Sequence, residues 1–166
     1  MAKANLFPDL REFLESLNSA GIKYMVVGGY AVNYHGYHRA TDDLDVWIAV
    51  DEENARLISR VMQSFAGFPR SKVPPSMFLE VGKVFIFGRE PVRIDILTGP
   101  SGVDFAECHA RCVRATLDGV IVPLISLDDL KCNKRASGRL KDLADLANLP
   151  DTELAVKKKK SKRKRK

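Results

Sequence analysis

Apolar residues recur at intervals of three and four in three parts of the chain, which is the spacing of one helix face. The three segments are 8–21, 51–65 and 126–149. Pro8 and Gly21 suit the first turn and the end of the first helix. Ser126 and Asp129 form a capping-box pattern at the start of the last segment. One or two helices are therefore expected there, with a break at Gly138.

Shorter apolar runs between these helices predict strands. The runs are 23–27, 44–50, 84–87, 92–97, 114–117 and 120–122, with short helices expected at 30–35 and 103–110 and two or three strands in all within 77–97. Asp118 and Gly119 predict a hairpin turn, and residues 73–75 and 88–91 predict a loop and a turn. This succession predicts an α/β or α+β fold, with a mixed sheet flanked by helices and a helical C-terminal part.

Charge is distributed unevenly along the 166 residues, whose formal net charge is +6. Nine of the ten residues 157–166 are Lys or Arg, and without them 18 basic residues of the 27 stand against 21 acidic ones. Like charges repel and bury nothing, so we expect residues 151–166 to be a disordered basic tail behind a domain formed by 1–150. The tail is interpreted either as an arm that binds nucleic-acid phosphates or as a solvated extension that aids solubility.

The composition narrows the class of protein further. No apolar run is long enough to span a membrane, and the N-terminus lacks the apolar core of a signal peptide. Three cysteines are too few, and odd in number, for a disulfide framework, so we expect a cytoplasmic protein. Cys108, His109 and Cys112 have no second ligand pair to complete a structural zinc site.

Candidate chemistry begins at Gly28 and Gly29, between a predicted strand and a predicted helix. Two glycines there permit a tight turn that brings backbone N–H groups close to an anionic ligand. A plain tight turn has the same sequence, so the pair is weak evidence by itself.

Three aspartates give a stronger signal. Asp43 and Asp45 stand at i and i+2 of a predicted strand, so their carboxylates share one face, whereas Asp42 would point to the opposite face. Asp95 stands between two isoleucines in a later strand. A cluster of such carboxylates provides the hard oxygen ligands that Mg²⁺ takes and suits two-metal phosphoryl chemistry. By parity Trp47 shares the face of Asp45 and is expected to line the site or its floor.

The succession of strand, Gly-Gly, a spacer of 13 residues, Asp-Leu-Asp and a later strand Asp resembles the polymerase-β-like nucleotidyltransferase superfamily. The closer resemblance is to bacterial AbiEii/MenT-like and minimal nucleotidyltransferases. It rests on Gly28-Gly29-Tyr30-Ala31, on Arg39-x-Thr41-x-Asp43-Leu44-Asp45, and on Lys134 with Arg139-x-Lys141-Asp142, and it covers roughly residues 23–149.

The resemblance implies roles for ten residues. Asp43, Asp45 and Asp95 would hold Mg²⁺ or Mn²⁺, and Asp95 would also help to activate an acceptor hydroxyl. The nucleotide would be bound by Gly28, Gly29, Arg39, Thr41, Lys134, Arg139 and Asp142. Where many members carry Ser, Gly29 offers only a backbone donor. A solvated basic helix face with an ordinary i, i+3 Arg–Asp pair is the other interpretation of the last three residues.

The resemblance also implies an enzyme that moves a nucleoside monophosphate from an NTP such as ATP to a hydroxyl. The acceptor would be RNA, for example the 3′ end of tRNA, or a partner protein, in the manner of toxin–antitoxin systems. One alternative is a non-catalytic module of the same fold that binds RNA or protein, which the complete set of carboxylates disfavours. A glycosyltransferase using Asp43 and Asp45 is disfavoured by the shortness of the chain.

Overall fold

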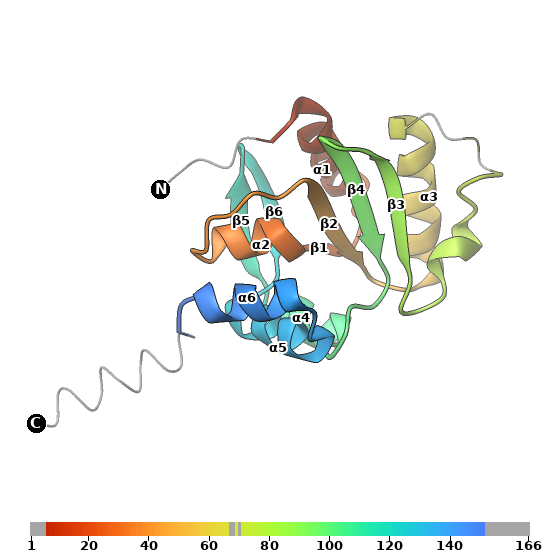
Figure 1. Ribbon diagram of the computed structural model, residues 1–166. Helices are drawn as coiled ribbons and strands as arrows, with labels where there is room; N and C mark the ends of the chain where they lie inside the picture. The colour runs from red at the N-terminus through yellow and green to blue at the C-terminus, as the bar shows by residue number, and fades with distance from the viewer. Residues whose placement is uncertain (1–5, 67–68, 70, 152–166) are drawn as a thin grey trace, which may run out of the picture.

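The computed structural model describes residues 6–66, 69 and 71–151. These residues form a mixed six-stranded sheet with the order β3-β4-β2-β1-β6-β5 and helices on both faces (Figure 1). The strands are β1 (Tyr24–Val27), β2 (Asp43–Ile48), β3 (Val84–Arg89), β4 (Val92–Leu97), β5 (Val113–Leu117) and β6 (Val120–Leu124). The helices are α1 (Pro8–Ser19), α2 (Gly28–Tyr34), α3 (Glu52–Ala66), α4 (Phe105–Ala110), α5 (Leu127–Ser137) and α6 (Leu140–Asn148), with a short 3-10 helix at Pro75–Phe78. The fold class expected from the pattern is confirmed.

Two local expectations need correction. Helix α2 begins at Gly28 and not at Tyr30, so both glycines belong to its first turn. The predicted loop at 73–75 ends one residue early, because Pro75 suits the first position of the 3-10 helix that follows. The stretch 77–97 contains two strands, in agreement with the two or three expected.

The order of the strands brings the two acidic segments together. Strand β2 pairs with β1 in the antiparallel sense and with β4 in the parallel sense, although β3 and all of α3 separate β2 from β4 along the chain. The register sets Asp45 opposite Asp95 and Asp43 opposite Arg93. Directly paired residues project to the same face of a sheet, so these four side chains share one face.

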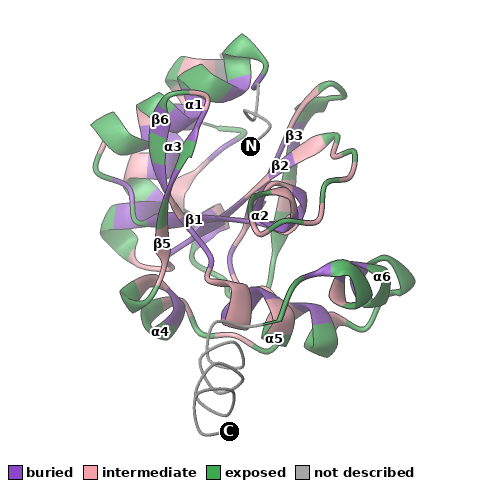
Figure 2. Ribbon diagram, turned by 90° about the vertical axis from the view of Figure 1, so that its left-hand side faces the viewer, coloured by how far each residue is buried: buried purple, intermediate pink, exposed green. Residues whose placement is uncertain are grey.

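The two faces of the sheet are covered differently (Figures 1 and 2). Helices α1 and α3 pack together on one face, where the rings of Phe13 and Phe65 lie 5.3 Å apart. The other face carries α2, and the helices α5 and α6 stand beside it. Buried strand residues such as Val26, Leu44 and Ile96 fill the space between sheet and helices. The carboxylate face is therefore left partly open between α2, α6 and the strand β3.

Turn and cap residues act as the sequence predicted. Asp118 and Gly119 both have positive φ, at 47° and 80°, and join β5 to β6. Ser126 accepts a hydrogen bond from the backbone N–H of Asp129 at 3.2 Å and caps α5. Gly138, with φ 64°, ends α5 and allows α6 to fold back beside it. This helical pair forms one wall of the site described below.

Two further expectations concern regions beyond the sheet. Apart from Asp151, the predicted basic tail lies outside the described residues. Within the described part of the chain, no helix is long and apolar enough to cross a membrane.

Candidate nucleotide and metal site

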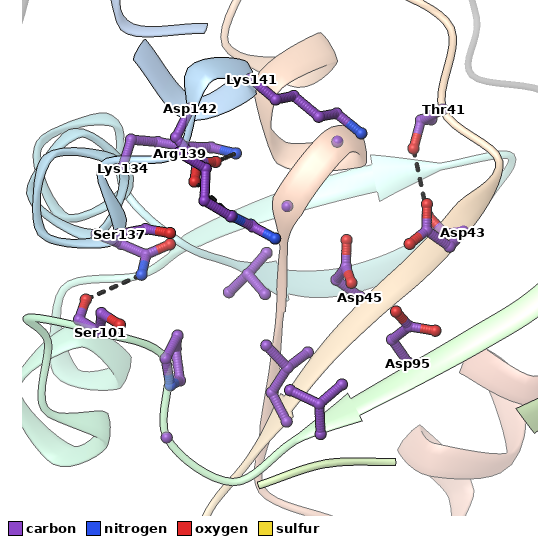
Figure 3. A pocket seen from close by; sticks show the side chains of 18 of the residues that line it. Thr41, Asp43, Asp45, Asp95, Ser101, Lys134, Ser137, Arg139, Lys141 and Asp142 are labelled. Carbon is purple, nitrogen blue, oxygen red and sulfur yellow. Dashed lines mark hydrogen bonds and ion pairs between the residues drawn. The ribbon is translucent and has the colours of Figure 1, made fainter. Parts of the chain in front are cut away.

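A cleft of about 470 Å³ opens over the carboxylate face of the sheet (Figure 3). All ten residues selected from the sequence line it: Gly28, Gly29, Arg39, Thr41, Asp43, Asp45, Asp95, Lys134, Arg139 and Asp142. The cleft also includes residues that the sequence did not single out, among them Val84, Arg93 and Lys141. Segments separated by more than 100 residues thus contribute to one concave surface.

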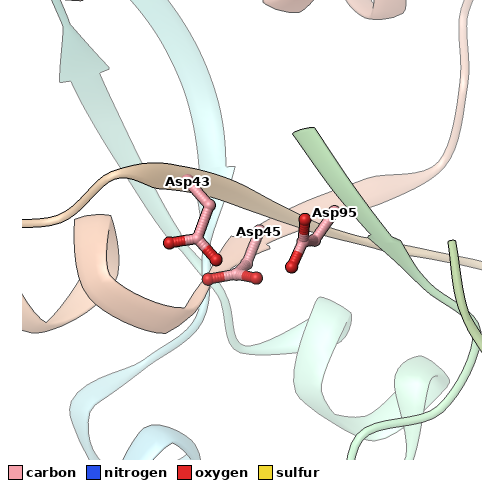
Figure 4. A group of neighbouring side chains, drawn as sticks. All are labelled: Asp43, Asp45 and Asp95. Carbon is pink, nitrogen blue, oxygen red and sulfur yellow. The ribbon is translucent and has the colours of Figure 1, made fainter. Parts of the chain in front are cut away.

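The three aspartates form its floor (Figure 4). One carboxylate oxygen from each of Asp43, Asp45 and Asp95 lies within 4.8 Å of the others. Asp95 is buried because β4 lies inside the sheet, between β3 and β2. Three oxygens converging at this distance make the type of ligand set that a hard divalent cation prefers.

Electrostatics support the same conclusion about the floor. Burial, followed by the charges of Asp43 and Asp95, raises the pKa of Asp45 to about 7. A nearby cation stabilises the charged form of a carboxyl group whose pKa is raised in this way. The residues present therefore fit Mg²⁺ or Mn²⁺ by donor type and by spacing.

Arg93 supplies the nearest positive charge to the triad. Its Nε and Nη2 donate to the two carboxylate oxygens of Asp95 at 2.8 and 2.9 Å, and Nη2 lies 4.0 Å from Oδ2 of Asp43. Arg93 was not among the residues selected from the sequence. The available signal was its position two residues before Asp95, which places both side chains on one face of a strand.

The two glycines leave room that other residues need. A Cβ on Gly28, whose φ is +65°, would lie 2.0 Å from Oδ2 of Asp45. A Cβ on Gly29 would lie 2.3 Å from Oγ1 of Thr41, whose hydroxyl donates to the backbone carbonyl of Asp43 at 3.3 Å. The absent side chains allow the first turn of α2 to approach the carboxylates closely. Thr41 occupies the space that a side chain at position 29 would fill.

A network of alternating charges forms the opposite wall (Figure 3). Lys134 Nζ lies 2.9 Å from both Asp142 and Asp145. Arg39 binds both oxygens of Asp145, at 2.7 and 2.9 Å, and Arg139 Nε donates to Asp142 at 2.8 Å. Lys134 is only 6% exposed, so the interpretation of a wholly solvated helix face is wrong for it, whereas Arg139 is 75% exposed and forms the expected i, i+3 pair.

The two aspartates of this network are strongly stabilised as anions. Burial alone would raise the pKa of Asp142, but hydrogen bonds from Arg139 and Lys134 outweigh it and lower the pKa to about 2. The pKa of Asp145 is lowered in the same way, against its burial, by Arg39 and Lys134. Asp145 was not predicted to matter, and its sequence context in a leucine-containing helix gave no signal.

Lys141 differs from the other cations around the cleft. It is exposed, lines the cleft, and extends away from α6 in Figure 3. Within the described residues, no carboxylate forms an ion pair with it, although its charge acts to lower the pKa of Asp45. Its ammonium group is therefore available for an anionic ligand.

Three residues near the glycine and aspartate motifs stand outside the cleft lining. Trp47 is buried on the expected face, but its ring packs edge-on against Phe105 of α4 at 5.3 Å, so it does not reach the cleft. Asp42 is exposed and outside the lining, in agreement with its omission. The ring of His35 contacts the carbonyl oxygen of Ile125 at 2.8 Å and lies outside the lining too.

Comparison with known proteins gives structural neighbours only. Neither a family model nor a curated protein sequence matches the chain. The antibiotic-resistance factor ANT(2'')-Ia superposes with a TM-score of 0.51 at 14% identity, over 84% of this chain and 79% of its own. A candidate nucleotidyltransferase from Thermotoga maritima superposes with a TM-score of 0.50 at 18% identity, over 83% of this chain and 88% of its own. The chain therefore has the nucleotidyltransferase fold.

Proposed function

We propose that the protein is a metal-dependent nucleotidyltransferase that moves a nucleoside monophosphate from an NTP to a hydroxyl group of a macromolecule. Residues 1–150 would form the transferase domain and 151–166 a basic extension. The observation that carries the proposal is the convergence of Asp43, Asp45 and Asp95 at the floor of a cleft whose other wall bears exposed cations. Superposition on a nucleotidyltransferase-type fold supports it independently.

The triphosphate binds on the side of α2 and α6. Arg139 and Lys141 project into the cleft from α6, and the backbone N–H groups of Gly28 and Gly29 belong to the first turn of α2, where donors lack intrahelical acceptors. The two cations can neutralise the charge of the β- and γ-phosphates, and the N–H groups can donate hydrogen bonds to them. Lys134 and Arg39 contribute to phosphate binding only indirectly, because both already form ion pairs with buried carboxylates.

The acceptor enters from the opposite side, over β3. Ile86 of β3 is paired with Asp95, and β3 is the edge strand next to β4 among the described residues. An acceptor hydroxyl that approaches Asp95 from this edge therefore crosses β3. The acceptor oxygen bonds to the α-phosphorus, pyrophosphate departs towards Arg139 and Lys141, and the hydroxyl proton passes to Asp95 or to water. Positioning and charge stabilisation provide most of the rate in such transfers.

Asp43, Asp45 and Asp95 would hold the divalent cation. When bound, it supplies Lewis-acid stabilisation of the charge that develops on the transferred and leaving oxygens. The chain's own contribution is to keep one oxygen from each of three carboxylates within 4.8 Å of the others at the floor of the cleft.

Two acceptors are supported by different observations. The run of Lys and Arg at 157–166 favours RNA, such as tRNA, because a polycation binds phosphates irrespective of sequence. The exposed apolar side chains of Val84 and Ile86, on the acceptor side of Asp95, favour a partner protein. A place in a toxin–antitoxin system is proposed on the resemblance to AbiEii/MenT-like and minimal nucleotidyltransferases alone.

A label-transfer experiment tests the proposal. The full chain is incubated with Mg²⁺ or Mn²⁺, total RNA or lysate protein, and each NTP labelled at either the α- or the γ-phosphate. Label from the α-position is expected on one acceptor class, and label from the γ-position on neither. Asp43→Asn and Asp45→Asn should abolish transfer, whereas Asp42→Asn, an exposed neighbour outside the cleft, should retain it.

The alternative outcomes are equally specific. Transfer of γ-label would indicate a kinase-type reaction and contradict the proposal. Nucleotide binding without any transfer would favour the non-catalytic module, and transfer that survives Asp45→Asn would exclude the carboxylate mechanism.

A further inference from the structure

Arg93 and a divalent cation require the same carboxylate. Both oxygens of Asp95 accept hydrogen bonds from the Arg93 guanidinium, in the two-pronged geometry that gives the strongest carboxylate pairs. Asp95 lies on β4, directly opposite Asp45 of β2 in the sheet. Arg93 is thus the counter-ion of Asp95 and also lies close to Asp43.

The hydrogen-bonded pair of Arg93 and Asp95 affects the binding of a divalent cation to the three aspartates. A cation placed among Asp43, Asp45 and Asp95 would lie beside the guanidinium, and like charges at such distances repel. It would also have to share the Asp95 oxygens that Arg93 already engages. Metal entry therefore either weakens the Arg93–Asp95 pair or is opposed by it.

A nucleotide phosphate in the cleft would offer the Arg93 guanidinium a second binding partner. Arg93 is partly exposed and lines the cleft beside Asp95, where the acceptor hydroxyl would meet the α-phosphate of the nucleotide. A guanidinium binds phosphate in the same two-pronged manner as carboxylate.

We propose that Arg93 exchanges partners during substrate binding, from the carboxylate of Asp95 in the free protein to a phosphate of the nucleotide in the loaded one. The inference rests on the proposed function of the same cleft. It assigns Arg93 two opposite effects: it opposes divalent-cation binding to the free protein and promotes it when nucleotide is present. The full cation complement then assembles only together with the nucleotide.

Binding of Mn²⁺ to the full chain tests the exchange without any turnover. Affinity is measured by calorimetry and by the electron paramagnetic resonance signal of free Mn²⁺, with and without an NTP analogue whose α,β-bridge is a methylene group. Without nucleotide, Arg93→Gln should bind Mn²⁺ about tenfold more tightly than the wild type, because one competing charge is gone. With the analogue, the same variant should bind Mn²⁺ about tenfold more weakly.

Two further variants serve as controls. Arg89→Gln removes an equal charge from an exposed residue of β3 outside the cleft, so it reports the general effect of net charge. Arg93→Lys keeps the charge but not the two-pronged geometry, and should show the same reversal in reduced form. Thermal unfolding and circular dichroism verify that each variant is folded.

The direction of the two changes decides the result. Weaker Mn²⁺ binding by Arg93→Gln in both conditions would make Arg93 a fixed support of Asp95 and overturn the exchange. Unchanged binding in both conditions would reduce the pair to a surface ion pair and overturn it as well. If the reversal occurs but no label transfer is ever detected, the exchange stands and the transferase proposal fails.

Discussion

Gly28 packs so closely against the carboxylate of Asp45 that a Cβ at position 28 would lie 2.0 Å from Oδ2 of Asp45. The N-terminal turn of α2 thus approaches the carboxylates only because residue 28 is a glycine. The positive φ of +65° reinforces this requirement, because side chains rarely tolerate that conformation.

Gly28→Ala is therefore expected to displace Asp45 and to reduce nucleotidyl transfer by more than about 100-fold, since misplaced catalytic groups lose much of their effect. Gly21→Ala is a matched control, because Gly21 has a similar φ of +70° and nothing within 4 Å of its added Cβ. Both variants should lose about 1–2 kcal/mol from backbone strain. Equal activity of the two variants, measured beside their melting curves, would contradict the steric argument.

The raised pKa of Asp45 predicts an unusual dependence of stability on pH. Its carboxyl has a pKa of about 7 in the folded protein against an ordinary value of 3.8, so between these pH values the folded chain keeps a proton that the unfolded chain releases. The free energy of unfolding in a chelator should therefore fall as the pH rises from about 4 to about 7, by at most about 1.4 kcal/mol per pH unit.

Urea unfolding at several pH values measures this slope. Asp45→Asn should remove most of it and should stabilise the metal-free protein at neutral pH. Saturating Mg²⁺ should raise the stability of the wild type near pH 7 and leave the variant unchanged. A slope that Asp45→Asn does not alter would assign the proton to another group.

Lys134 and Arg139 should separate structural from substrate-binding cations. Lys134 is 6% exposed and bridges two buried carboxylates, so Lys134→Met should cost about 3–5 kcal/mol of unfolding free energy. Arg139 is 75% exposed, and Asp142 keeps Lys134 as a partner, so Arg139→Ala should cost less than about 1 kcal/mol. Denaturant unfolding and nucleotide titration of the same samples should show opposite rankings of the two variants.

Lys141 should bind the nucleotide without supporting the fold. Lys141→Ala should raise the dissociation constant of an NTP about tenfold and weaken its salt dependence, with an unchanged melting temperature. Lys23→Ala is a suitable control, because Lys23 is exposed and precedes β1 at the end opposite the cleft. Equal loss of affinity in both variants would indicate a general charge effect.

Local sequence patterns were sufficient to predict the helices and strands and to select the three aspartates at the floor of the cleft. Helix and strand periodicities identified most elements to within a few residues, because amphipathic spacing and turn residues act locally. The parity of Asp43 and Asp45 placed both carboxylates on one face, and Asp95 was selected because a carboxylate between two isoleucines is unusual in a strand. Each of these inferences concerns neighbours within one element.

Only the tertiary structure determines which side chains from different helices and strands meet in the cleft. The pairing of β2 with β4 brings Arg93 against Asp95 and Asp43, and the return of α6 beside α5 buries Lys134 between Asp142 and Asp145. A lysine or arginine has the same appearance in a sequence whether it is solvated, buried or bound to a distant carboxylate. Its role depends on which charges the fold brings within a few ångströms, and that is a property of long-range packing and not of local pattern.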